Sequence, residues 1–321
     1  MKPFTIALIA VTLATPVAHS DVEETRTTLR QHVLKLINRD RAIYNLPPVE
    51  LDVAASAIGD AYCREQIRTG STGHFGVDGR PPYMRYSLAG GNDGVSENAA
   101  AWSANYTFSD RALYEMSRRS QDAMMAEAPP KDGHRRTILD PHATHVGIGL
   151  AWERGEFRLV HEFIRRYVDW TRPLPRQARL GDEVIARGRP LRGTSVEAIT
   201  VHYEPVPLAM PAHVASAFES YALPDKRKEY RPRLRQSVRQ RLDGTLEISR
   251  REYPDGRRGD FYLGDDGAFS FTVPFPEGAG IYTVVVWVRK EGATHAVAAS
   301  NVSIRVDSAL QTTTRASAAG R

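Results

Sequence analysis

The sequence predicts an α+β protein of two domains, and three features of the chain lead to this prediction. The chain has 321 residues with 41% hydrophobic and 25% charged residues, which suits a folded protein large enough for two cores. Apolar residues recur at helical spacing in the first half, whereas short alternating runs dominate the second half. A Pro-containing stretch lies between the two patterns. We therefore expect a layered α+β domain followed by a β-sandwich of immunoglobulin-like type.

The expected boundaries follow these changes in composition. The predicted parts are a signal peptide at 1–20, a first domain at 21–170, a linker at 171–178, a β-sandwich at 179–308 and a disordered tail at 309–321. The linker is predicted from its prolines, and the tail from its content of Thr, Ser and Ala.

The N-terminus has the pattern of a secretory signal peptide. Lys2 gives a positive start, residues 4–14 are mostly apolar, and Ala18-His19-Ser20 places small residues at the −3 and −1 positions of a cleavage site. The mature chain then begins at Asp21. No later segment has 18 consecutive apolar residues, so we expect no transmembrane segment after cleavage and a secreted or periplasmic location.

Helices dominate the first predicted domain. Apolar residues at helical spacing predict helices at about 23–45, 51–70 and 107–128, and Pro or Gly ends each of them. The intervening residues 75–105 are rich in Gly, Pro, Ser and Asn. They predict a long loop with only short regular pieces, and a loop of this length is usually functional.

Strands follow the helices. Residues 145–152 and 157–164, joined by a Gly-containing turn, predict a hairpin. In the second half, the runs at 269–273, 280–288 and 301–306 predict strands, and Asp-Gly pairs predict turns between strands. The pattern favours a β-sandwich there.

Cysteine gives this chain no cross-link. Cys63 is the only cysteine, so no internal disulfide can form and stability must come from packing. Its position within a predicted helix favours a small buried apolar residue over a reactive thiol.

The stretch from Gly73 to Leu139 carries the residues with the most suggestive chemistry. Two histidines and at least two glutamates lie there beside glycines or predicted helix ends, where side chains can converge on a cleft. Imidazole and carboxylate together suit a divalent metal ion or a general acid/base pair. The His-Glu-x-x-His spacing of a zinc protease does not occur in the sequence.

Six short motifs occur in one order along the segment 34–167. They are Ile37-Asn38-Arg39-Asp40-Arg41, then Leu46 to Asp52, His74 with Asp78-Gly79 and Arg85, Glu97-Asn98, Gly133-His134-Arg135 with Ile138-Leu139, and Val146-Gly147-Ile148-Gly149. In these motifs the segment resembles the CAP superfamily (cysteine-rich secretory, antigen 5 and pathogenesis-related class 1 proteins), in its bacterial secreted, SCP-like branch. The resemblance covers less than half of the chain.

The resemblance implies a CAP-type α-β-α sandwich with a cleft lined by two histidines and two acidic residues. Carried over by position, His74 and His134 are the histidines and Glu97 is the first glutamate. The second glutamate is expected on the helix before His134, which favours Glu127 over its rival Glu115. Twelve residues separate these two, so on a helix they point about 120° apart.

The predicted site residues are thus His74, Glu97, Glu127 and His134, as ligands of a divalent metal ion, zinc above all. The alternative is a buried hydrogen-bond network that holds the long loop to the helices. No other cofactor is expected.

The expected function is that of a ligand- or divalent-metal-binding module at or outside the bacterial cell envelope, and no enzymatic activity is established by the pattern. Two alternatives stay open. One is a metal-assisted hydrolase that uses the His/Glu cleft. The other is an adhesive or structural envelope protein that binds through its β domain.

A basic segment at 226–241 suggests a further partner. Eight of its sixteen residues are cationic: Lys226, Arg227, Lys228, Arg231, Arg233, Arg235, Arg239 and Arg241. This density predicts attraction to an anionic envelope polymer, and the alternative is a solvated insertion in the β domain. No nucleic acid is expected, because no aromatic-interleaved nucleic-acid motif appears and the chain is predicted to be exported.

Overall fold

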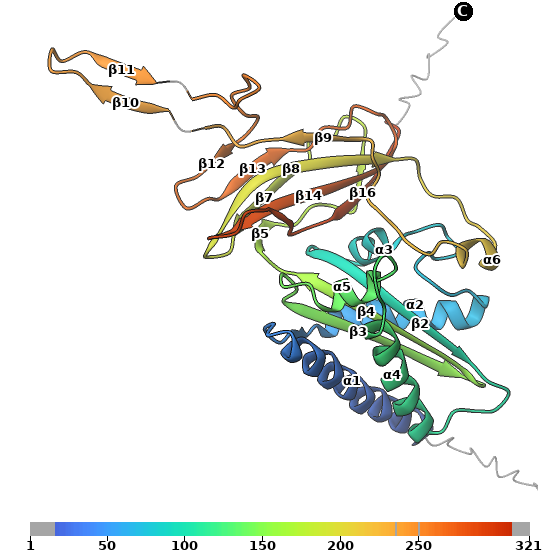
Figure 1. Cartoon of the computed structure of the whole chain (residues 1–321). Coiled ribbons are helices and arrows are strands. Elements are labelled where there is room, and N and C mark those ends of the chain that lie inside the picture. The colour runs from blue at the N-terminus through green and yellow to red at the C-terminus, as the bar shows by residue number, and fades with distance from the viewer. Residues whose placement is uncertain (1–16, 235, 250, 310–321) are drawn as a thin grey trace, which may run out of the picture.

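The computed structural model describes residues 17–234, 236–249 and 251–309 (Figure 1). Helices and a four-stranded sheet form the first domain, and two further sheets form the second, which confirms the mixed α+β class. None of the helices within the described ranges is long and apolar enough to cross a membrane. Most of the predicted signal peptide (1–16) and of the predicted tail (310–321) lies outside the described residues.

The sheet of the first domain has the order β1-β3-β4-β2. Its strands are β1 (Glu50–Leu51), β2 (Gly94–Ser103), β3 (His145–Glu153) and β4 (Glu156–Arg165). The predicted hairpin is confirmed as β3 and β4, which pair antiparallel over their whole length. Because β4 is the one strand that pairs with β2 among the described residues, β2 forms one edge of the sheet.

Helices cover both faces of this sheet. The helices α1 (Val17–Ile43) and α4 (Asp110–Met125) pack on one face, where they share a hydrophobic core with β3 and β4. The helix α2 (Val53–Thr69) covers the other face. Glycines make this packing close, since a Cβ atom on Gly59 would lie 2.9 Å from the Cα atom of Gly149 in β3.

The prediction of a long loop at residues 75–105 is wrong for most of this segment. The structure has a short helix α3 (Pro82–Leu88) and the ten-residue strand β2 there. The sequence of β2 contains few β-branched or aromatic residues, so local propensity does not favour a strand. Pairing with β4 at every residue from Gly94 to Ser103 holds it extended.

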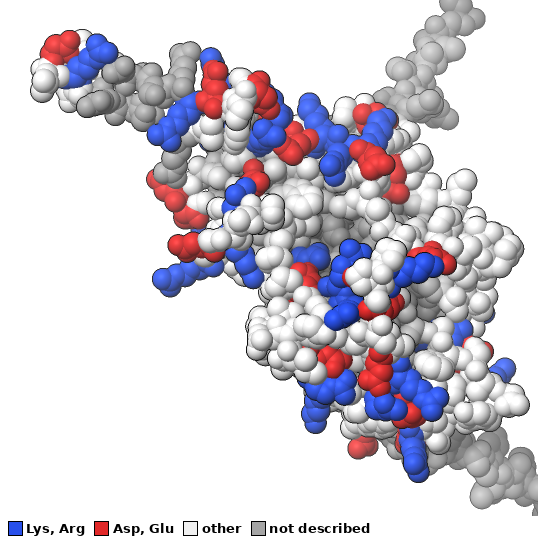
Figure 2. All heavy atoms as spheres, viewed as in Figure 1, with Lys and Arg blue, Asp and Glu red and all other residues white. Residues whose placement is uncertain are grey.

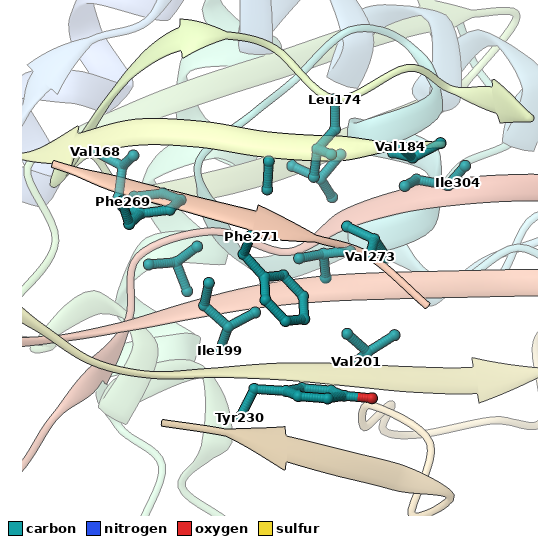
Figure 3. Packing of buried hydrophobic residues seen from close by; sticks show 14 of the residues in the cluster. Val168, Leu174, Val184, Ile199, Val201, Tyr230, Phe269, Phe271, Val273 and Ile304 are labelled. Atoms are coloured by element: carbon teal, nitrogen blue, oxygen red, sulfur yellow. The ribbon is translucent and has the colours of Figure 1, made fainter. Parts of the chain in front are cut away.

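Two sheets face each other in the second domain, and apolar side chains from both fill the space between them (Figure 3). Val168, Phe269 and Phe271 come from one sheet, while Ile199 and Ile304 come from the other. The first sheet has the order β12-β13-β7-β5. Its strands are β5 (Val168–Arg172), β7 (Ile185–Pro190), β12 (Tyr262–Leu263) and β13 (Phe269–Thr272).

The second sheet has the order β6-β16-β14-β8-β9, with β15 paired to β14. Its strands are β6 (Gln177–Arg179), β8 (Thr194–Glu204), β9 (Arg227–Tyr230), β14 (Gly280–Lys290), β15 (Val297–Ala298) and β16 (Val302–Asp307). A separate hairpin of β10 (Ser237–Gln240) and β11 (Leu246–Ser249) projects away from the domain (Figure 1).

The predicted linker at 171–178 is part of the second domain instead. Its first two residues belong to β5, and its last two belong to β6. Between them, Leu174 is only 3% exposed in the core of that domain. Prolines suggest a linker by composition, but here they stand between two short strands whose apolar residues are buried.

The two domains are in direct contact. The hydroxyl of Tyr83 in α3 donates to Glu204 of β8 at 2.8 Å, and Arg176 donates to the carbonyl of Gly91 at 2.8 Å. The chain between β8 and β9, which contains the short helix α6 (Ala212–Ala215), runs down to the first domain (Figure 1).

Candidate functional site

A cleft of 1310 Å³ opens at the β2 edge of the first domain. Its walls come from the turn after α2, the edge strand β2, residues 127–141 with the helix α5 (Gly133–Ile138), and residues 216–221 of the second domain. Arg165 of β4 also lines it. All four predicted site residues line it.

His74 stands on the α2 side of the cleft. The preceding Gly73 has a φ of 81°, in the left-handed region that favours glycine, and so turns the chain after α2. The carbonyl of Gly73 accepts hydrogen bonds from Tyr62 and Gln66 of that helix, each at 2.9 Å. His74 is therefore fixed by its own turn and is only 7% exposed.

A glutamate from β2 holds the His74 ring. Glu97 Oε1 lies 2.9 Å from His74 Nδ1, and its other oxygen pairs with the guanidinium of Arg85 from α3. Arg85 also donates to the carbonyl of His74 at 3.1 Å and stacks over the ring of Tyr62. The first histidine is thus supported by a buried ion pair.

Burial also sets the protonation state of this histidine. Burial, followed by the positive charge of Arg85, lowers the pKa of His74 to about 4, and the carboxyl of Glu162 opposes the shift only in part. His74 is therefore neutral near pH 7, which is the form that can act as a ligand or as a base.

His134 is held on the other side of the cleft by a second glutamate. Glu127 Oε1 lies 2.5 Å from His134 Nδ1, and Oε2 accepts the backbone N–H of His134 at 2.9 Å. The side chain of Asn98 in β2 donates to the carbonyl of His134 at 3.0 Å. One carboxylate thus fixes both the ring and the start of α5.

The two histidine–glutamate pairs meet across β2. Glu97 and Asn98 are neighbours in a strand, so their side chains point to opposite faces of the sheet and hold one histidine each. The ring centroids of His74 and His134 are 6.1 Å apart. Both Nδ1 atoms are bound to glutamates, and in the described part of the chain neither Nε2 atom has a hydrogen-bond partner.

Glu115, the other candidate for the second glutamate, lies outside the cleft. Glu115 is on the outer face of α4, where it pairs with Arg118 and Arg119, and it does not line the cleft. The structure therefore places Glu127, and not Glu115, beside the second histidine.

Three further residues of the site are not among the predicted ones: Arg85, Glu162 and Tyr221. Glu162 stands opposite Glu97 in the β2–β4 ladder and is fully buried. Burial, and then the charge of Glu97, raise the pKa of Glu162 well above its usual range. A glutamate at an inward position of an apolar strand is the sequence signal that points to it.

Tyr221 comes from the second domain. Its ring lies 5.1 Å from that of His74, and its hydroxyl accepts the backbone N–H of Glu97 at 2.5 Å. No local pattern in the sequence could predict this contact, because it joins the loop between β8 and β9 to a different domain.

Metal binding is not shown by this arrangement. Within the described residues, no three His, Cys, Asp or Glu side chains are grouped so as to hold one metal ion. The carboxylates of Glu97 and Glu127 are engaged with the histidines, and the four-ligand site stays a prediction.

Comparison with known proteins agrees with the fold and the motif order of the first domain. Residues 34–160 match the sequence model described as CAP, the cysteine-rich secretory protein family. Residues 34–160 therefore form a CAP domain, and the predicted CAP superfamily is confirmed for this part of the chain. No curated protein matches the chain.

Two solved structures are similar to parts of the chain. One is an extracellular protein containing a SCP domain from Bacillus anthracis str. Ames, with 17% identity, a TM-score of 0.33, and coverage of 49% of this chain and 45% of that chain. The other is the CAP domain of Enterococcal PrgA, with 16% identity, a TM-score of 0.31, and coverage of 43% and 60%. The chain thus spans less than two thirds of either of them.

Proposed function

We propose that the cleft is a ligand-binding site in which His74 and His134 together hold an exchangeable divalent ion. The observation that carries this proposal is the pairing of each imidazole with its own glutamate through Nδ1. A histidine that ligates a metal typically donates its other ring N–H to a carboxylate, which fixes the ring and makes it a better donor. Both Nε2 atoms are then the nitrogens available to an ion.

The chemistry of the donor set favours zinc held weakly. Neutral imidazole is a good zinc ligand, and His74 is neutral near pH 7. Two protein ligands leave the remaining positions to water or to a bound ligand. When bound, such an ion supplies a Lewis acid that can hold an anionic group of the ligand.

The glutamates serve as supports in this proposal. Glu97 is tied to Arg85 as well as to His74, and Glu127 is tied to the start of α5. If either carboxylate became a ligand, it would have to release its histidine. We therefore assign the rings as ligands and the carboxylates as the groups that position them.

We also propose export to the envelope or beyond it and an immunoglobulin-like class for the second domain, as the sequence predicts. The anionic envelope polymer has less support from the surface charges. Lys226 pairs with Glu277, and Arg231 pairs with Glu229 and Asp255. Blue and red side chains are mixed on the face seen in Figure 2. The hydrolase and adhesive alternatives stay untested.

Calorimetric titration of the full chain with zinc tests the proposed ion site. We expect His74→Ala and His134→Ala each to weaken zinc binding at least about tenfold, because each removes one of two ligands. Glu127→Ala should weaken it by a similar factor through the loss of ring support. Glu115→Ala is the matched control and should bind as the wild type does. Equal zinc binding by the wild type and by the double histidine variant would reject the proposal.

A further inference from the structure

The outer edge of β2 is partly occupied by side chains of the second domain. The backbone N–H of Val95 donates to Asn301 Oδ1 at 3.3 Å, and Asn301 Nδ2 lies 3.5 Å from the carbonyl of Val95. Two residues on, the N–H of Glu97 donates to the hydroxyl of Tyr221. Side chains thus complete the hydrogen bonds that a neighbouring strand would make at these two positions.

The next two positions on this edge are open. Alternation along a strand directs the backbone groups of Ala99 and Ala101 to the same side as those of Val95 and Glu97. Across the part of the chain that the structure describes, these outward groups have no hydrogen-bond partner. Ala99 lines the cleft and Ala101 is exposed, and their methyl groups are too small to cover the backbone.

The opposite edge of the same sheet shows how this fold covers an edge that is not used. On β3, the N–H of Ile148 donates to the hydroxyl of Ser56 at 2.9 Å, and the N–H of Leu150 donates to Asp60 at 2.7 Å. The carbonyl of Ile148 accepts from Arg30 at 2.9 Å. Polar side chains of α1 and α2 therefore close that edge, whereas at Ala99 and Ala101 small side chains leave the edge open beside the cleft.

We propose that an extended acidic peptide binds in the cleft by adding a strand to β2 at Ala99–Ala101. Addition of a strand to an exposed sheet edge is a general mode of peptide recognition, in which main-chain hydrogen bonds supply the affinity. The surface continues directly from the contacts that Asn301 and Tyr221 make with the same edge.

The charge at the rim of the cleft selects an acidic peptide. Lys131 lines the same cleft as Ala99 and takes part in no ion pair among the described residues. Of the other cations that line the cleft, Arg136 and Arg165 are paired with Asp132 and Asp140, whereas Arg135 donates to the hydroxyl of Tyr44 and has no ion pair among the described residues. Lys131 and Arg135 are therefore the cations that can meet a carboxylate of the peptide. Opposite charges speed the encounter and help to fix the register of the peptide.

This mode of binding does not require the ion of the proposed function. It uses main-chain groups of β2, whereas the ion would be held by the histidine rings. The two proposals can therefore fail separately.

Fluorescence anisotropy of the full chain with a fluorescein-labelled peptide of sequence Glu-Val-Thr-Val-Glu-Val tests the inference. We expect saturable binding by the wild type. Ala99→Pro removes an N–H that is outside the β2–β4 ladder, so the sheet should form while peptide affinity falls at least about tenfold. Ala99→Ser keeps the N–H and is the matched control, which should bind as the wild type does.

A second measurement does not depend on the folding of any variant. The same peptide with alternate amides N-methylated cannot form the strand pairing, so we expect it not to bind to the wild type. The His74→Ala/His134→Ala double variant should bind the unmodified peptide normally, which separates this test from the zinc titration.

Three results would overturn the inference. The first is no saturable binding of the unmodified peptide, and the second is equal binding of the N-methylated peptide. The third is a concentration-dependent dimer of the wild type that Ala99→Pro abolishes, since the edge would then belong to a second copy of the chain.

Discussion

His161 shows how a single buried side chain can set the response of the fold to pH. It is fully buried in β4, and both of its ring nitrogens lack a hydrogen-bond partner within the described residues. Burial lowers the pKa of His161 to about 3, and His134 adds a smaller effect in the same direction. The folded protein thus excludes a proton that the unfolded chain binds from about pH 6.5 downward.

The sign of this effect gives a prediction for His161→Phe. Below pH 6.5 the unfolded state binds more protons, so the free energy of unfolding should fall by up to about 1.4 kcal/mol per pH unit as pH drops toward 3. His161→Phe should make this loss less steep, because the added ring can pack beside Phe163 and does not titrate. Urea denaturation at pH 4.5 and pH 7 measures the difference.

The exposed His295 provides the control for this comparison. His295→Ala should lose stability between the two pH values as the wild type does. If His161→Phe shows the same pH dependence as the wild type, the excluded proton is not at His161.

Among the elements, the sheet of the CAP domain depends on glycines that allow α2 to lie close to β3. A Cβ atom on Gly149 would overlap the backbone of Gly59 in α2, and one on Gly147 would overlap Ala55. The motif Val146-Gly147-Ile148-Gly149 is therefore explained by packing. Because its glycines have no side chain, the backbones of α2 and β3 can lie in close contact.

Gly149→Ala should for this reason destabilise the fold by about 1–3 kcal/mol, the usual cost of overpacking a core. Gly133→Ala is the matched control, since a Cβ atom there meets nothing within 4 Å and the residue does not have a positive φ. Chemical denaturation of both variants gives the two free energies. Similar values for both would show that the α2–β3 contact is not close in solution.

The elements differ in how far the sequence could predict them. The helix α4 and the hairpin of β3 and β4 follow from periodicity and turn residues, and the structure has them close to the predicted ranges. The strand β2 could not be predicted in this way, because its alanines become extended only through pairing with β4. Glu97 can be identified from its sequence motif. The position of Glu162 opposite Glu97 depends on the register of β2 and β4.

At the scale of the whole molecule, the cleft and the interface between the domains are parts of one surface. Tyr221 completes the wall beside His74, and Ser303 accepts and donates hydrogen bonds with Ser87 of α3. The sequence predicts two domains but not their contact, since the bonds that join them connect residues far apart in the chain. We therefore expect the two domains to stabilise each other.

A fragment of residues 21–172 tests the importance of this contact. It lacks β7, the partner of β5, as well as the side chains that cover β2 at Val95 and Glu97. We expect its thermal midpoint to lie several degrees below that of the full chain, since a loss of about 1 kcal/mol shifts the midpoint by a few degrees. An identical midpoint would mean that the domains do not stabilise each other.

The position of a bound ion is the most direct test of the two-histidine site. In a crystal of the full chain soaked with zinc, anomalous scattering should show one ion in the cleft at about 2.1 Å from Nε2 of both His74 and His134. Glu97 and Glu127 should remain on the Nδ1 atoms. An ion held by the glutamates with the histidines displaced, or no ion in the cleft at saturating zinc, would contradict the assignment of the two rings as ligands.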